Sequence, residues 1–249
     1  MASPLRTRFA KDIVAEFLPP ARKTKSAKVI ILCGGMPGYG DKRDLIKFFS
    51  GRGFWVFHPR YRGSWESGGQ FLKISPHRDI LDVINQLPKG FTEALHHKRY
   101  KVKPDKIYVI GGSFGGPAAL LVSADPRVSK VIAVSPVVDW GAPSREEPLG
   151  PLFNYLKEGF GNGYRLSKTN WQKLGRGNFY NPSRNLSKID VQKILMVHAM
   201  DDYVVMAGPV KKFAAKTGAP LIMLKKGGHL STSVILEPKL YKKIKKFLG

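Results

Sequence analysis

The sequence is short of acidic residues. Its 249 residues include 42 Lys and Arg but only 18 Asp and Glu, which gives a formal net charge of +24. In principle such an excess favours phosphate-rich partners or anionic membranes. The lysines are dispersed along the chain, however, and no nucleic-acid-binding motif is present. We therefore expect no nucleic-acid partner and keep weak binding to anionic surfaces as a hypothesis.

Cysteine and long apolar runs are also scarce. Cys33 is the only cysteine, so no disulfide can form within the chain, and this usage suits a reducing compartment. No stretch of about 18 apolar residues is present, and the N-terminus lacks the apolar segment of a signal peptide. No group of residues has the spacing of metal ligands. We expect a soluble, cytoplasmic protein that uses no metal and no other cofactor.

Short β-branched runs alternate with helical patterns along most of the chain. An edge strand is expected over residues 12–18, and buried strands over 27–33, 53–59, 106–112, 129–135, 192–199 and 219–225. Helices are expected over residues 42–50, 76–100, 114–124, 206–217 and 231–248. Continuous apolar strands separated by helices predict an α/β protein with a mostly parallel, doubly wound sheet. Ligands of such sheets bind at the carboxyl ends of the strands.

One segment interrupts this alternation. Residues 139–185 show no clear strand pattern, and glycines and prolines recur in them. Eight of these 47 residues are aromatic, which is 17% against 11% for the whole chain. We expect the segment to pack as a small cap inserted into a single domain that spans residues 1–249.

The stretch "GGSFGG" at residues 111–116 follows one of the expected strands. It fits the pattern G-x-S-x-G between a strand and a helix, where a sharp turn lifts the serine hydroxyl above the edge of the sheet. The glycines permit the turn and let the strand and helix approach closely. The alternatives are a plain glycine-rich turn and a phosphate-binding loop, and the second is disfavoured because no Gly-Lys-Ser/Thr follows. Ser113 is therefore the candidate nucleophile.

A serine nucleophile needs a base and an acid, and hydrolases of this kind present them in the chain order Ser, Asp, His. The segment "MDDYVV" follows the strand expected to end at residue 199 and contains Asp201 and Asp202. The segment "KGGHLS" follows the next strand and contains His229. Each candidate thus lies at the same edge of the sheet as Ser113. The sequence predicts a triad of Ser113, one of the two aspartates, and His229.

The oxyanion of acyl transfer also requires hydrogen-bond donors. One is the backbone N–H of Phe114, the residue after the nucleophile. The second is expected in the loop "CGGMPGYG" at residues 33–40, in which Pro37 has no N–H. Met36 is the best donor in this loop. The alternatives there are Gly35 and Gly38.

Together these segments resemble the α/β-hydrolases, and among them the prolyl-oligopeptidase-like (peptidase S9-type) serine hydrolases and esterases. The similar segments, within about residues 28–248, are "IILCGGMPGYG", "PRYRGSWESGG", "GGSFGG", "NPSRNLSKI" with "ILMVHAMDDYVV", and "GGH". The resemblance implies an α/β-hydrolase fold. It also implies that Asp201 is the triad acid and that Asp202 bonds nearby backbone. Two departures are Gly34, where the family commonly has a histidine, and the absence of the β-propeller of the large peptidases.

We predict a serine hydrolase that forms an acyl-enzyme, with a small-molecule ester or a short peptide as substrate. A carboxylesterase for apolar or aromatic esters ranks first, because the cap is aromatic. Substrate contacts are expected from Tyr39, Trp65 and Trp140, with packing in the core or the cap as the alternative role of these side chains.

Two other functions stay open. A small aminopeptidase is the second choice, since related aminopeptidases anchor the substrate ammonium with paired glutamates, and Glu146 and Glu147 form such a pair. The same stretch, "PSREEPLG", is also typical of a polar surface turn. The third is a non-catalytic binding protein on the same fold, because a fold alone does not establish activity.

Overall fold

The computed structural model describes residues 3–38, 41–144 and 146–249. In it, the described residues form an eight-stranded sheet in the order β1-β2-β4-β3-β7-β8-β9-β10. The strands are β1 (Leu5–Phe9), β2 (Ile13–Leu18), β3 (Lys28–Cys33), β4 (Phe54–Pro59), β7 (Lys106–Gly112), β8 (Val128–Val134), β9 (Ile194–Ala199) and β10 (Leu221–Leu224). β1, β2 and β4 pair antiparallel, and all other neighbours pair parallel. The predicted α/β fold with a mostly parallel sheet is confirmed.

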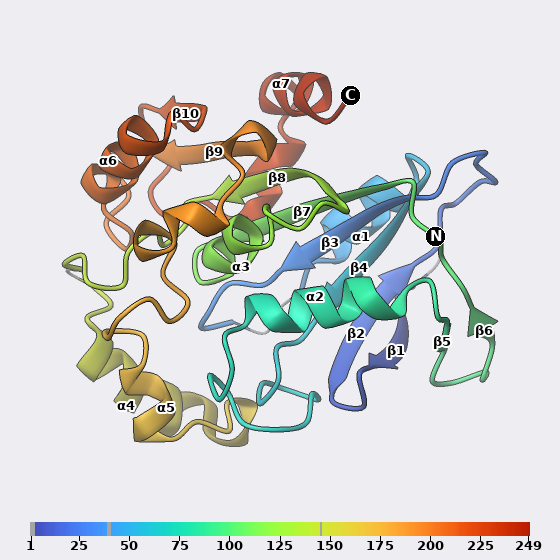
Figure 1. Ribbon diagram of the computed structural model, residues 1–249, viewed down its shortest axis with the longest axis horizontal. Helices are drawn as coiled ribbons and strands as arrows, with labels where there is room; N and C mark the ends of the chain where they lie inside the picture. Colours follow the sequence, from blue (N-terminus) through green and yellow to red (C-terminus); the bar gives the residue numbers. More distant parts are fainter. Residues whose placement is uncertain (1–2, 39–40, 145) are drawn as a thin grey trace.

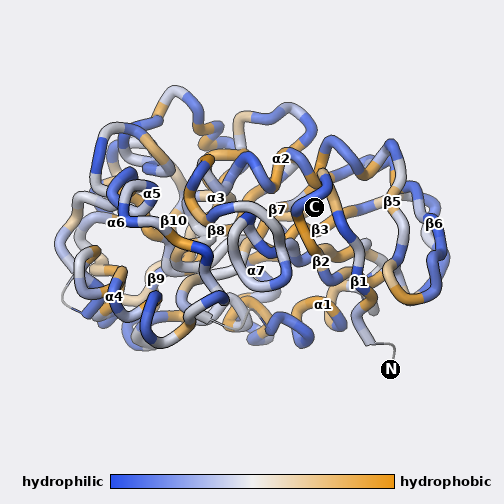
Figure 2. The backbone as a smooth tube through the Cα atoms, turned by 90° about the horizontal axis from the view of Figure 1, so that it is seen from below, coloured by the Kyte–Doolittle hydropathy of each residue, from blue (hydrophilic) through white to orange (hydrophobic). Residues whose placement is uncertain are grey.

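Helices cover both faces of the sheet (Figure 1). They are α1 (Arg43–Ser50), α2 (His77–Gln86), α3 (Gly115–Leu121), α6 (Ala207–Thr217) and α7 (Pro238–Leu248). α2, α3 and α6 bury their apolar side chains in one core, whereas α1 and α7 bury theirs in the other. In Figure 2 the orange, apolar stretches gather in the middle of the molecule around β2, β3 and β7. No helix in the described part of the chain is both long and apolar enough to span a membrane.

The long helix expected over residues 76–100 is wrong. α2 ends at Gln86, and the chain then forms a small hairpin of β5 (Phe91–Thr92) and β6 (Arg99–Tyr100). Pro88 and Gly90 follow the helix closely, and both disfavour its continuation. The Phe91 ring then packs against Phe9 and Phe17, with ring centroids 5.2 Å apart in each case. Helix-breaking residues and this aromatic cluster together override the helical pattern.

Two further boundaries differ from expectation. β2 was expected to be an edge strand, but it pairs on its outer side with β1, which forms the edge of the sheet. No strand was expected at β1, whose sequence is the short, alternating "LRTRF". The helix expected over residues 231–248 begins instead with a 3-10 turn (Thr232–Leu236), and α7 starts at Pro238. Proline suits the first turn of a helix because its missing N–H has no partner there.

The segment from residue 139 to residue 185 contains α4 (Leu149–Phe160) and α5 (Lys168–Gln172). These two helices lie together at one end of the molecule, apart from the helices on the faces of the sheet (Figure 1). Several aromatic side chains of this segment reach the main core. The buried ones are Tyr164, Trp171 and Tyr180. We keep the interpretation of residues 139–185 as a cap inserted into one domain.

Candidate active site

The nucleophile elbow joins β7 to α3. Ser113 has a φ of +50°, in the left-handed region that residues other than glycine rarely adopt. A Cβ atom on Gly111 would overlap the carbonyl oxygen of Gly115, and one on Gly115 would overlap that of Cys33. The turn therefore requires glycine at both positions. The N–H of Ser113 donates to the Val134 carbonyl (3.0 Å), which fixes the elbow to β8.

His229 lies in the loop after β10, beside a buried aspartate. Its Nδ1 atom is 3.0 Å from Oδ2 and 3.1 Å from Oδ1 of Asp202. Asp202 Oδ1 also accepts the N–H groups of Val204 and Val205. Burial alone would raise the pKa of Asp202, but the hydrogen bonds from His229 and Val205 and the charge of His229 hold it below its ordinary value. A carboxylate on Nδ1 orients the imidazole and leaves Nε2 for proton exchange.

The expected contact between Asp201 and His229 is wrong. The Asp201 carboxylate instead accepts hydrogen bonds from the N–H groups of Gly228 (2.9 Å) and Gly227 (3.2 Å). These bonds hold the pKa of Asp201 below its ordinary value. The two aspartates are adjacent in a tight turn, so their side chains leave it in different directions. Asp201 holds the loop that carries the histidine, and Asp202 holds the histidine itself.

A buried serine that the sequence reasoning missed supports this pair. Ser135, directly after β8, accepts the N–H of Leu230 through its Oγ atom (3.2 Å) and hydrogen-bonds to Asp202. His198 Nε2 lies 3.6 Å from Asp202 Oδ2 and 3.0 Å from the Val205 carbonyl oxygen. A polar residue at the carboxyl end of an expected buried strand is the signal that could have identified Ser135.

The loop after β3 lies against the elbow. A Cβ atom on Gly35 would be 3.5 Å from Ser113 Cβ, so these two residues are close neighbours. Met36 and Phe114, the predicted oxyanion donors, both line a small cavity of about 20 Å³. The structure thus brings the two donor loops together. Donation by these two N–H groups to an oxyanion stays a prediction.

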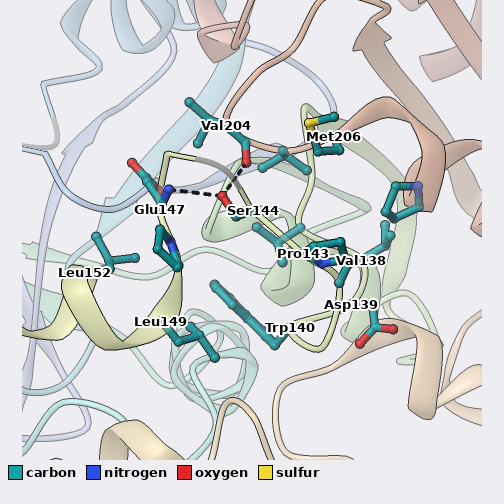
Figure 3. A pocket seen from close by; sticks show the side chains of 15 residues that line it. Val138, Asp139, Trp140, Pro143, Ser144, Glu147, Leu149, Leu152, Val204 and Met206 are labelled. Carbon is teal, nitrogen blue, oxygen red and sulfur yellow. Dashed lines mark hydrogen bonds between the residues drawn. The ribbon is translucent and has the colours of Figure 1, made fainter.

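A larger pocket of about 310 Å³ lies between the cap segment and the loop after β9, the loop that carries Asp202 (Figure 3). Val137, whose N–H donates to the Ser113 carbonyl (3.2 Å), forms part of one wall. Val204, next but one to Asp202, forms part of another. Most residues that the cap contributes are apolar. They include Trp140, Ala142, Pro143, Leu149 and Leu152.

The charged cap residues that line this pocket are Glu147 and Asp139. Burial raises the pKa of Glu147; the charge of His229 opposes this shift and that of Asp202 adds to it. Its carboxyl group therefore lies within electrostatic reach of the histidine-aspartate pair. The adjacent Glu146 is exposed.

The three aromatic residues expected to contact substrate have different positions. Trp140 lines the 310 Å³ pocket, and its Nε1 donates to the Tyr180 carbonyl (2.8 Å). Trp65 lines the small cavity near Met36 and also a separate, charged pocket of about 390 Å³. Its ring packs against Tyr164, with ring centroids 5.8 Å apart. Tyr39 lies outside the described residues.

Comparison with known families agrees with this geometry. Residues 42–249 match the model of the prolyl oligopeptidase family. The chain belongs to the prolyl oligopeptidase family. None of the curated protein sequences is significantly similar to it.

Solved structures of hydrolases share the fold at low sequence identity. An acylaminoacyl peptidase from Pyrococcus horikoshii superposes with a TM-score of 0.63 at 19% identity over 99% of this chain. The chain spans only 40% of that peptidase. A Pyrococcus furiosus esterase gives a TM-score of 0.65 at 15% identity, covering 99% of this chain and 89% of the esterase. Est1E from Butyrivibrio proteoclasticus, solved with ferulic acid, gives 0.62 at 16% identity and covers both chains fully.

The structure also shows what lies beside Gly34, where this prolyl oligopeptidase family member lacks the expected histidine. A Cβ atom on Gly34 would be 3.3 Å from Nε2 of His58, a buried residue of β4. His58 Nδ1 is 2.7 Å from Arg60 Nη1, and Arg60 Nη2 donates to Glu16 (2.9 Å). Burial lowers the pKa of His58 to about 4. The hydrogen bond with His58, followed by the charge of Arg60, outweighs burial and lowers the pKa of Glu16 to about 2. A histidine from another strand thus packs against the loop.

Proposed function

We propose that the protein is a serine hydrolase that cleaves carboxylic esters through an acyl-enzyme. The observation that carries this proposal is the contact of His229 Nδ1 with the buried Asp202 carboxylate, 3.0 Å away, in the loops that flank the strained Ser113 elbow. A nucleophile, a base and an orienting acid are the three parts that such chemistry requires.

In the proposed reaction, His229 removes the Ser113 hydroxyl proton while the oxygen attacks the substrate carbonyl carbon. The imidazolium that forms is stabilised by Asp202, and the N–H groups of Met36 and Phe114 stabilise the oxyanion. His229 then gives its proton to the departing alcohol. Water, activated by the same imidazole, hydrolyses the acyl-Ser113 ester and restores the enzyme.

The 310 Å³ pocket supports apolar or aromatic substrates. Its walls are mostly aliphatic and aromatic side chains, among them Trp140, Leu149, Leu152 and Val204. A pocket of this size accommodates a small acyl or alcohol group. Two of the structures that share the fold are esterases, and one of these was solved with ferulic acid, an aromatic acid.

A fluorophosphonate probe tests the nucleophile. We expect the probe to modify Ser113 covalently and the variant Ser113→Ala to stay unmodified. We also expect Ser113→Ala to lose ester hydrolysis on the order of a thousandfold or more while its melting temperature is unchanged. A wild-type protein that hydrolyses a panel of p-nitrophenyl esters no faster than buffer, and takes up no probe, would support the non-catalytic binding protein instead.

A small aminopeptidase is the second candidate, because of Glu147. This residue lines the pocket, and its carboxyl group interacts electrostatically with His229 and Asp202. A carboxylate there would suit a substrate with a free amine. Amide bonds break only when the leaving nitrogen is protonated, so peptidases need such anchors to hold the bond against the base. We rank the esterase first because the rest of the pocket is largely apolar.

Binding to anionic surfaces is a separate proposal that concerns the C-terminal part of the chain. Residues 203–249 contain ten lysines and a single acidic residue, Glu237. All ten lysines are exposed. We expect weak, electrostatic sedimentation with vesicles that contain phosphatidylserine, lost in high salt. Absent or salt-insensitive sedimentation would remove this proposal.

A further inference from the structure

Two buried tyrosine hydroxyls hold the two loops that carry the predicted oxyanion donors. The first belongs to Tyr180, in the cap segment, which is 1% exposed. Its hydroxyl donates to the carbonyl oxygen of Phe114 (2.6 Å) and accepts the N–H of Ala118. The Tyr180 side chain, 66 residues from Phe114 in the sequence, therefore contacts the chain directly after the nucleophile, where α3 begins.

The second hydroxyl belongs to Tyr61, in the loop after β4. It donates to the carbonyl oxygen of Gly34 (3.1 Å), two residues before the predicted donor Met36. Tyr61 is 6% exposed, and its hydroxyl lies beside that of Tyr180; each hydroxyl has a single proton, which it donates to a main-chain carbonyl. Burial raises the pKa of both tyrosines well above the ordinary value, so both hydroxyls stay protonated and remain donors at any working pH.

The ring of Phe114 is enclosed by the same side chains. Its centroid lies 5.0 Å from that of Tyr180 and 5.6 Å from that of Tyr61. Phe71 and Trp140 complete the enclosure at 5.4 Å and 5.7 Å. The carbonyl group and the ring of Phe114 are therefore both held. Its N–H lies in the preceding peptide plane, joined to them only through the φ and ψ angles of Phe114, so the two contacts limit how far that plane can turn.

Tyr180 itself is held in an unfavourable conformation. Its φ is +49°, in the left-handed region, which is strained for a residue other than glycine. The hydroxyl bond to Phe114 and the bond from Trp140 Nε1 to the Tyr180 carbonyl (2.8 Å) fix this residue at both ends. Such strain persists only where surrounding contacts enforce it, which suits a residue that must reach one exact point.

We infer that Tyr180 and Tyr61 are positioning residues that set the oxyanion donors, and that the cap acts on catalysis through Tyr180 as well as on substrate binding. This inference rests on the proposed serine-hydrolase function. Without the Tyr180 hydroxyl, the Phe114 carbonyl loses a buried partner and the first turn of α3 relaxes. The Phe114 N–H then points less well at the oxyanion, which matters only when charge has developed in the transition state.

The test compares Tyr180→Phe and Tyr61→Phe with Tyr108→Phe. Tyr108 is a matched control because its hydroxyl is also buried and also donates to a main-chain carbonyl, that of Leu248 (3.2 Å), but in α7. For p-nitrophenyl acetate we expect Tyr180→Phe to lower kcat on the order of tenfold with KM changed less than twofold, since the donor is displaced rather than removed. Tyr61→Phe should act in the same direction, and Tyr108→Phe should leave kcat unchanged.

A trifluoromethyl ketone supplies the readout that a merely structural role would not move. It forms a tetrahedral adduct with the serine, so its affinity should fall by the same factor as kcat/KM in Tyr180→Phe. If Tyr180→Phe keeps wild-type kcat and ketone affinity, or if Tyr108→Phe loses as much, the positioning role is wrong. If the wild type itself neither hydrolyses esters nor reacts with fluorophosphonate, the proposed function fails instead, and the two failures are thereby distinguished.

Discussion

The sheet edge that carries the candidate triad and the cap that forms the pocket are held by different kinds of interaction. At the edge, main-chain N–H groups are the usual donors: that of Ser113 donates to the Val134 carbonyl of β8, and that of Gly228 donates to the Asp201 carboxylate. In the cap, side chains reach main-chain carbonyls far away in sequence. Examples are Ser144 Oγ to Val204 (3.0 Å) and Trp171 Nε1 to Leu149 (2.7 Å).

This difference predicts how each region responds to substitution. Main-chain bonds at strand ends are fixed by the sheet, so the chemistry at the edge depends on a few side chains that cannot be exchanged. Side-chain bonds in the cap can be removed one at a time, so substitutions there should alter substrate preference more than the chemical step.

The largest effect is expected from Asp202→Asn. An amide at this position donates to His229 Nδ1 rather than accepting from it, which favours the wrong imidazole tautomer. We expect kcat/KM for p-nitrophenyl acetate to fall by about 10⁴-fold. Asp201→Asn is the matched control: its carboxylate accepts the N–H groups of Gly227 and Gly228 and does not orient the imidazole, so we expect a loss of less than about tenfold. Equal losses would contradict the assignment of Asp202.

The positions of the elbow and of the strand ends could be predicted from the sequence, because they follow from local sequence patterns. Ser113 and His229 each follow a buried strand, and parallel strands bring their carboxyl ends to one edge. Which of Asp201 and Asp202 contacts His229 could not be predicted from the sequence. It depends on how one tight turn directs two adjacent side chains, and no periodic pattern encodes that. The family resemblance pointed to the wrong one for this contact.

The contacts of the cap and of the region behind the elbow were harder to predict, for a different reason. They join residues remote in sequence, such as Tyr180 with Phe114 and Trp140 with Tyr180. An aromatic-rich segment predicts burial, but it does not say which ring or hydroxyl reaches which loop. The hairpin after α2 was missed likewise, because Phe91 is held by Phe9 of β1 and Phe17 of β2, which are remote from it in sequence.

A smaller effect at the edge is expected from Ser135→Ala. The substitution removes the hydroxyl that bonds Leu230 and Asp202, so the histidine loop loses one support. We expect kcat to fall roughly tenfold to a hundredfold with KM little changed, because the base is misplaced rather than removed. Ser123→Ala is the control, since it also removes a fully buried serine hydroxyl, bonded to the Leu120 carbonyl (2.6 Å). A Ser123→Ala variant that loses as much activity would point to general destabilisation.

In the cap, Ala142→Phe should change substrate preference instead of chemistry. Ala142 lines the 310 Å³ pocket, and a phenyl ring there would occupy part of its volume. We expect KM for a naphthyl or cinnamoyl ester to rise about tenfold, while kcat/KM for p-nitrophenyl acetate stays within about twofold. Ala215→Phe on the exposed side of α6 is the matched control. If Ala142→Phe impairs the hydrolysis of both esters equally, this pocket does not bind the substrate.

The smallest effect is expected from Glu147→Gln, and it separates the two candidate activities. Burial raises the pKa of Glu147, so its carboxyl group gains charge at a higher pH than an ordinary glutamate does. If the carboxylate binds a substrate ammonium, KM for an aminoacyl p-nitroanilide should fall as the pH rises through that raised pKa. The range from pH 5 to 7 is suitable, because an α-amino group, with a pKa of about 7.7–8.0, stays mostly protonated there.

Glu147→Gln should abolish this pH dependence and raise the anilide KM about two- to fivefold, as expected for a partly exposed ion pair. It should spare the p-nitrophenyl ester, and Glu146→Gln, which changes the exposed neighbour, should spare both substrates. We expect the ester to remain much the better substrate in every variant. An amide nitrogen leaves only after His229 has protonated it, which requires the amide bond to be held firmly against the imidazole, and a single carboxylate does not hold it firmly enough. An anilide that wild type cleaves faster than the ester, and that loses its pH dependence in Glu147→Gln, would make the cap an amine-binding site and the protein an aminopeptidase.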